Sequence, residues 1–196
     1  MKTLIINASQ PVAGMSEGKL NDFLAKVIRE ELEQNGHEVR LTEIKNGYDI
    51  DEEVEKHLWA DVIITQSPVY WFGNPWIYKK YVDEVFNAGL LQQKMVANDG
   101  RTRSDLTKQY GTGGLMQGKK YMLSLTWNAP AIAFNDERQF LFAGKSVDDF
   151  FMFNTANYKF CGVEILPSFS CHDVLKQGGI DHDIERLKAH LAKYVL

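Results

Sequence analysis

The sequence lacks the features of several large classes of protein. It has only two cysteines, Cys161 and Cys171, so a disulfide framework is excluded. The two alternatives are a single disulfide between them and, as the favoured interpretation, free, partly buried thiols in a cytoplasmic protein. No apolar run approaches the roughly 20 residues that span a membrane, and the apolar start at residues 1–7 is too short for a signal peptide. The net charge of -4 leaves no basic footprint for nucleic acid. We therefore expect a cytoplasmic protein with no membrane span and no nucleic-acid partner.

Common catalytic and ligand-binding motifs are also missing. Neither G-x-G-x-x-G nor G-x-x-x-x-G-K-[ST] follows the first apolar run. His172-Asp173 and His182-Asp183 lack the tight spacing of metal ligands, so we expect a solvated surface segment and no metal site. Asp51-Glu52-Glu53 is typical of a solvated helix start, where acidic side chains suit the helix dipole. If the protein is an enzyme, its chemistry should belong to a bound cofactor.

Short apolar runs alternate with stretches of helical spacing along the whole chain. With 196 residues, 44% of them hydrophobic, the sequence suits a single domain, 1–196, with a full core. The expected strands are 4–6, 37–42, 61–66, 121–126 and 163–169. The expected helices are 20–32, 51–58, 77–86, 147–160 and 184–195. Polar, Gly-rich residues at about 88–118 indicate a functional insertion.

This alternation predicts an α/β fold with a mainly parallel sheet and helices on both faces. Five strands favour a flavodoxin-like three-layer sandwich, with strand order 2-1-3-4-5, over a six-stranded dinucleotide fold, although periodicity alone leaves the two close. Ligands of such sheets bind beyond the carboxyl ends of the strands. Three loops of unusual composition leave those ends, at 8–16, 67–76 and 127–135.

Each of the three loops has a functional and a structural interpretation. The segment Ser16–Asn21 enters a helix whose N–H groups suit a phosphate, but Ser16 also suits a plain N-cap. The segment Ser67–Trp76 holds four aromatic residues, which suit either the wall of an isoalloxazine ring or an apolar corner or dimer interface. Backbone N–H groups at Thr126–Pro130 could stabilise the pyrimidine edge of a flavin. The structural alternative is that the same residues form an ordinary proline turn.

Motifs along nearly the whole chain match those of a known family. The sequence resembles the flavodoxin-fold NAD(P)H:quinone reductases of the modulator-of-drug-activity-B type, relatives of DT-diaphorase. The matching segments are Leu4-Ile5-Ile6-Asn7, Gly18-Lys19-Leu20-Asn21-Asp22, Leu58-Trp59-Ala60-Asp61-Val62, Pro75-Trp76, Lys79-Lys80-Tyr81, Asp99-Gly100-Arg101-Thr102-Arg103, Tyr110-Gly111-Thr112-Gly113-Gly114-Leu115 and residues 117–130. The last segment is long and of rare composition, so the match is specific to this branch.

The resemblance implies a homodimer that binds FAD near the subunit interface, with NAD(P)H as reductant and a quinone as acceptor. The residues that would hold the FAD diphosphate and adenosine side are Ser16, Glu17, Gly18, Lys19, Leu20, Asn21, Asp22 and Phe23. The residues that would flank the isoalloxazine are Val69, Tyr70, Trp71, Phe72, Thr126, Trp127, Asn128 and Ala129. Tyr110, in the insertion, would also contact FAD.

The sequence departs from the family in the second loop. Pro68-Val69-Tyr70-Trp71-Phe72-Gly73 stands where close relatives are expected to have Pro-Gly-Trp-Trp-Met-Gly, which keeps an aromatic wall but alters the acceptor pocket. The tyrosine and histidine that assist flavin reduction in mammalian relatives have no match after Asn128-Ala129, so no side chain is assigned an acid–base role.

These observations predict an FAD-dependent NAD(P)H:quinone oxidoreductase. It would reduce quinones by two electrons in a ping-pong cycle, because one apolar slot serves both ligands in turn. The alternatives are an FMN-dependent azoreductase or flavin reductase, a flavodoxin-type electron carrier without enzymatic activity, and a scaffold that kept the fold and lost the cofactor.

Overall fold

One parallel sheet forms the centre of the molecule. The computed structural model describes residues 1–14, 16–176 and 179–196. Its strands are β1 (Lys2–Asn7), β2 (Glu38–Glu43), β3 (Val62–Pro68), β4 (Lys120–Thr126), β5 (Glu164–Ile165) and β6 (Phe169–Cys171). They follow the order β2-β1-β3-β4-β5, with β6 also paired to β4 and all pairs parallel. The predicted α/β class and strand order are confirmed.

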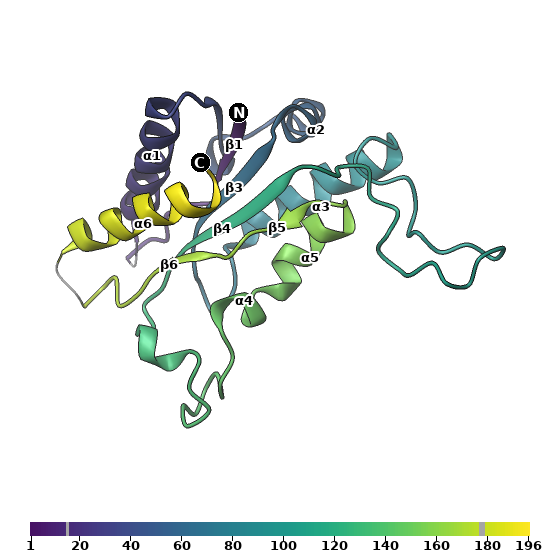
Figure 1. The fold of residues 1–196 in the computed structure, drawn as a ribbon. Coiled ribbons are helices and arrows are strands. Elements are labelled where there is room, and N and C mark those ends of the chain that lie inside the picture. The colour runs from purple at the N-terminus through teal and green to yellow at the C-terminus, as the bar shows by residue number, and fades with distance from the viewer. Residues whose placement is uncertain (15, 177–178) are drawn as a thin grey trace.

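Helices cover both faces of this sheet and make three layers (Figure 1). The helices are α1 (Lys19–Gln34), α2 (Ile50–Trp59), α3 (Trp76–Leu91), α4 (Val147–Phe150), α5 (Met152–Phe160) and α6 (Ile180–Tyr194). Apolar side chains of α1 and α6 pack on one face of the sheet. Those of α2, α3 and α5 pack on the other face. The strands β1, β3 and β4 are buried on both sides, as their continuous apolar runs predict.

Two expected elements are divided in the structure. The single helix predicted at 147–160 is wrong, because α4 and α5 are separated at Phe151, which is fully buried. The strand predicted at 163–169 consists of β5, which pairs with the start of β4, and β6, which pairs with its end. Pro167 lies between them, and its missing N–H cannot contribute to a continuous ladder. β6 also continues past the predicted end, to Cys171.

The expected solvated helix start contains one fully buried carboxylate. Asp49 caps α2 by accepting from Glu52 N at 3.0 Å. Glu53, however, has no exposed surface, and its carboxylate accepts from Thr42, Lys56 and Tyr81. The prediction of a solvated side chain was therefore wrong for Glu53, which lies on the sheet-facing side of α2.

The segment predicted as an insertion extends away from the body of the molecule, as the teal segment in Figure 1 shows. Helix α3 continues to Leu91, a few residues past the predicted start of the insertion. Both cysteines are free and buried, and burial raises the pKa of each thiol to about 12. Within the described residues, no helix combines the length and apolar character needed to cross a membrane.

Candidate functional site

Three loops meet at the carboxyl edge of the central strands. Parallel register places Asn7 of β1 beside Gln66 of β3, and Pro68 of β3 beside Thr126 of β4. The chain leaves these ends through residues 8–18, 69–75 and 127–146. The sequence predicted this meeting, and the parallel sheet brings it about.

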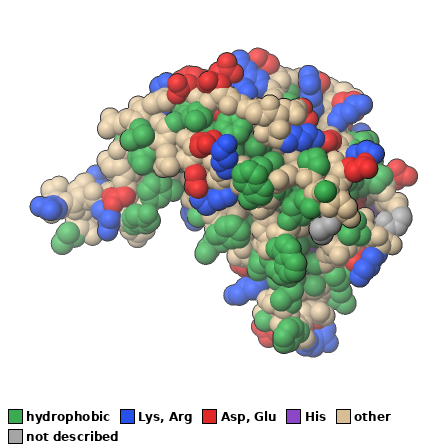
Figure 2. Space-filling view, turned by 180° about the vertical axis from the view of Figure 1, so that it is seen from behind, with side chains coloured by type: hydrophobic (Ala, Val, Ile, Leu, Met, Phe, Trp, Pro, Cys, Tyr) green, Lys and Arg blue, Asp and Glu red, His purple; other side chains and the backbone are tan. Residues whose placement is uncertain are grey.

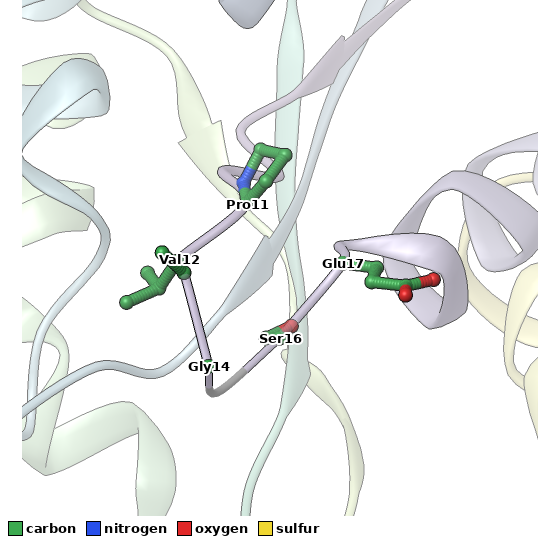
Figure 3. A pocket seen from close by; sticks show the side chains of 6 residues that line it. Pro11, Val12, Gly14, Ser16 and Glu17 are labelled. Atoms are coloured by element: carbon green, nitrogen blue, oxygen red, sulfur yellow. The ribbon is translucent and has the colours of Figure 1, made fainter.

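The first loop surrounds an open pocket of about 590 Å³. Figure 3 shows its lining residues, which are Pro11, Val12, Ala13, Gly14, Ser16 and Glu17. Val12 and Ser16 exchange backbone hydrogen bonds of 2.8 and 3.0 Å, so the loop folds back on itself like a short hairpin. Glu17 points away from Val12 toward the α1 side of the loop (Figure 3).

Helix α1 begins at the end of this loop, and Gly18 is its N-cap. Gly18 has a φ of 77°, a left-handed conformation that favours glycine. Ser16 is not the N-cap; its Oγ accepts from Gly18 N at 3.2 Å. The first intrahelical bond runs from Asn21 N to Gly18 O, so the N–H groups of Lys19 and Leu20 precede it. Such N–H groups, at the positive end of the helix dipole, suit an anionic ligand.

Asn21 connects α1 to the centre of the sheet. Its side chain is buried and bonds Gln66 Nε2 at 2.8 Å and Thr126 Oγ1 at 3.1 Å. Ser124 Oγ donates to Gln66 Oε1 at 2.6 Å and extends the network across β4. The Asn21 amide is thus occupied beneath the loop and fixes where α1 begins relative to β3 and β4.

Asp22 belongs to a second polar cluster at the end of β1. Its carboxylate accepts from Asn7 Nδ2 at 2.7 Å, Ser9 Oγ at 2.6 Å and Lys45 Nζ at 2.6 Å. Burial raises the pKa of Asp22, but the hydrogen bonds from Lys45, Ser9 and Asn7 outweigh burial and hold that pKa below its usual value. Phe23, by contrast, presents an exposed aromatic ring on α1.

The second loop contains a tight turn with two bulky residues in the left-handed region. Trp71 and Phe72 have φ values of 46° and 67°. Tyr70 and Gly73 close the turn with backbone hydrogen bonds of 2.8 and 3.1 Å. Two-residue turns with positive φ usually hold Asn or Gly, so tryptophan and phenylalanine here are strained. Strain of this kind concentrates at functional sites.

The side chains of this turn are divided between anchoring and exposure. Tyr70 Oη donates to Gln10 O of the first loop at 2.9 Å. Phe72 packs edge-on against Phe142, with ring centroids 6.3 Å apart, and so contacts the third loop. Trp71 lies between these two anchors and is 92% exposed. The turn therefore holds one large aromatic face in solvent at the edge of the sheet.

The third loop folds over an aromatic core. The Trp127 side chain is only 2% exposed and packs against Phe134 and Phe151, so it does not line an open surface. Its Nε1 is buried and has no hydrogen-bond partner within the residues that the structure describes. Trp127 N donates to Cys171 O at 2.9 Å, which leaves Asn128 and Ala129 as the next backbone donors along the loop.

Two further predicted features remain, one on the insertion and one behind the third loop. Tyr110 stands on the insertion, where its ring contacts Phe160 at 5.3 Å and Arg101 at 5.3 Å. His172 is partly buried behind the third loop, with Nδ1 3.3 Å from Ala129 O, so the prediction of a solvated surface was wrong for it. In the described ranges, no three His, Cys, Asp or Glu side chains gather as a metal site requires.

The sequence alone does not identify the polar partners beneath the loops. Lys45 lies 23 positions from Asp22, and no local pattern connects them. Gln66 and Ser124 gave a weak signal, since each is a polar residue near the end of an apolar strand.

Comparisons with known proteins show the family and the fold of the chain. A family model described as flavodoxin-like fold matches residues 1–195. The chain is 46% identical to NADPH:quinone oxidoreductase MdaB of Haemophilus influenzae, over 92% of each chain. The crystal structure of a putative quinone reductase from Klebsiella pneumoniae has a TM-score of 0.73 at 24% identity, and the match covers 98% of this chain and 83% of that chain. General stress protein 14 of Treponema denticola in complex with FMN has a TM-score of 0.62 at 22% identity, covering 98% and 97%.

Proposed function

The chain belongs to the flavodoxin-like fold family, as its motifs predicted, and we propose that it is an FAD-dependent NAD(P)H:quinone oxidoreductase. Its high identity to a named NADPH:quinone oxidoreductase supports the reaction class. The strained turn that holds Trp71 in solvent and contacts the first loop through Tyr70 is the observation that carries the proposal. A planar cofactor gives this exposed apolar face a purpose.

The residues present fit a flavin. The start of α1 offers the N–H groups of Lys19 and Leu20 to phosphate, with Ser16 as a hydroxyl neighbour. Trp71 forms an aromatic wall for the ring. The N–H groups of Asn128 and Ala129 would donate to the pyrimidine edge, where negative charge develops on reduction. Bound there, the cofactor supplies hydride transfer from NAD(P)H and a two-electron reduction of quinone to hydroquinone.

The protein's own contribution is binding, orientation and exclusion of water. The anchors at Tyr70 and Phe72 keep the Trp71 face in place, so the flavin ring would be held in one orientation. The nicotinamide and the quinone would use one shared slot over the flavin in turn. We therefore expect parallel lines in double-reciprocal plots; intersecting lines would contradict a shared slot.

A homodimer is part of the proposal. Large exposed apolar side chains lie on α3, on α5 and in the insertion, and these are Trp76, Leu91, Met152, Phe153 and Leu106. Figure 2 shows apolar side chains spread over the face between the protruding insertion and the body. A second copy on this face would cover them and would bring the partner's insertion, with its Tyr110, toward the cofactor. Sedimentation equilibrium tests this, and a monomer at micromolar concentration would contradict it.

One experiment tests the central proposal. The purified protein is denatured, the released flavin is weighed, and the holoprotein is mixed with NADPH and then with a quinone. We expect FAD, bleaching of its absorbance by NADPH, and recovery of the absorbance on quinone addition. Release of FMN would replace FAD in the proposal, as in the FMN complex of the same fold. A protein that stays colourless with added FAD would overturn it, and slow bleaching would favour an electron carrier.

A further inference from the structure

A lysine distant in sequence faces the start of α1. Lys45 lies in the 3-10 turn Ile44–Asn46 that follows β2. Its Nζ donates to Asp22 Oδ1 at 2.8 Å, to Asp22 Oδ2 at 2.6 Å and to Ser9 Oγ at 3.2 Å. The side chains of Lys45 and Asp22 are 23% and 35% exposed, so solvent screens this pair less than the ion pairs of the open surface.

The same cluster touches the N-cap of the helix. Ser9 donates its hydroxyl to Asp22 Oδ1 at 2.6 Å. A Cβ at Gly18 would lie 3.5 Å from Ser9 Cβ, which means that Ser9 packs directly against Gly18. Lys45 is thus connected through Ser9 to Gly18, where the first loop ends and α1 begins.

Asp22 poses an electrostatic problem for a phosphate at this helix start. An acidic side chain in the first turn interacts well with the helix dipole while no ligand is present. A bound phosphate, however, occupies the same end of the helix, and like charges repel. Among the cations of the described residues, Lys45 is the one whose ammonium bonds both oxygens of this carboxylate.

We infer that Lys45 is a positioning residue for the cofactor's phosphate: it neutralises Asp22 and holds Ser9 against Gly18 without itself lining the pocket. This rests on the proposed flavin binding. Because the effect is carried by charge, it depends on the phosphate and not on the flavin ring. A lysine that only stabilised the fold would affect both parts of the ligand alike.

Flavin titrations of the apoprotein test this, with riboflavin, FMN and FAD as probes. Lys45→Met should weaken FMN and FAD about ten-fold, the size expected when one nearby unit charge loses its partner, with riboflavin changed less than about two-fold. Lys45→Arg should retain affinity. The double variant Asp22→Asn/Lys45→Met should regain most of the loss, because removing the carboxylate removes the need for the lysine. The loss should shrink in about 1 M salt.

The matched control is Lys26→Met. Lys26 is also on α1 and forms an exposed pair with Glu30 at 3.6 Å, so its removal changes net charge equally without touching the loop. Equal weakening of riboflavin and FMN in Lys45→Met, or FMN affinity equal to that of Lys26→Met, would overturn the inference. A double variant as weak as Lys45→Met alone would also overturn it. Wild-type apoprotein that binds none of the three flavins would refute the proposed function itself.

Discussion

The backbone of Cys161 leaves no room for a side chain at Gly114. A Cβ at Gly114 would overlap the carbonyl carbon and oxygen of Cys161. Met116 N donates to Cys161 O at 2.8 Å, and Leu115 N donates to Met95 O at 2.9 Å. The returning end of the insertion is therefore attached to the body through close backbone contact just after α5.

Gly114→Ala should lower the free energy of unfolding by about 3 kcal/mol, because backbone atoms cannot move aside as a flexible side chain would. Urea unfolding measures this. Gly118→Ala is the control: nothing lies within 4 Å of a Cβ there, and its φ of 81° makes the cost about 1 kcal/mol. Equal losses in the two variants would show that the contact with Cys161 does not restrain the insertion.

Trp71→Gly should separate stability from function. Glycine suits the left-handed φ of 46°, and the exposed indole contributes little packing, so the free energy of unfolding should stay constant or rise by up to about 1 kcal/mol. Flavin affinity and quinone reduction should nevertheless fall, because the aromatic wall is gone. Trp71→Ala should lose the same activity with the fold retained. A destabilised variant with unchanged flavin affinity would make the turn a structural corner.

The fold followed from sequence where burial and periodicity agree. The apolar runs of β1, β3 and β4 predicted central strands, and the helical spacing in α1 predicted its buried face. The break between α4 and α5 did not follow, because apolar spacing continues through it. Phe151 is placed there by its contact with Trp127, at 5.5 Å between ring centroids, across 24 residues of sequence. Such a tertiary contact has no local signal.

The candidate site was predictable as a set of loops but not as a set of side-chain directions. The sequence placed Trp71 and Trp127 at strand ends without distinguishing them. The structure exposes Trp71 and buries Trp127, and only the packing of Phe134, Phe142 and their neighbours decides this. The direction of the Asn21 side chain is likewise set by its hydrogen bond with Gln66, which lies 45 residues away in the sequence.

Glu53→Gln should lower the free energy of unfolding by about 3–5 kcal/mol, since it removes the charge of a fully buried carboxylate that pairs with the partly exposed Lys56. The carboxylate accepts from Tyr81 at 2.6 Å, from Thr42 at 2.9 Å and from Lys56 at 2.5 Å, whereas an amide would turn a donor toward these donors. Glu30→Gln, in an exposed pair, should change the free energy by less than about 0.5 kcal/mol. A loss below about 1 kcal/mol for Glu53→Gln would show that water reaches the cluster.

As the pH is lowered, the free energy of unfolding should begin to fall well before the carboxylates are protonated, and His57 should account for part of this fall. Burial lowers the pKa of His57 from the reference value of 6.5, and its Nδ1 lies 2.8 Å from Glu53 O. Below pH 6.5 the unfolded chain therefore binds a proton that the folded chain does not, and stability declines until the pH passes the folded pKa. The pKa values of His37, His172 and His190 are lowered too, with the same sign.

The pH dependence of His57→Gln isolates this contribution. Wild type should lose up to about 1.4 kcal/mol per pH unit for each such histidine between pH 6.5 and 5, and the variant should show a shallower slope over that range. Asp22, whose pKa is lowered from 3.8, changes stability only below about pH 5, which is outside this range. An unchanged slope in His57→Gln would mean that the folded protein accommodates a charged imidazole there, and the polar groups around Glu53 and Tyr158 would then have to solvate it.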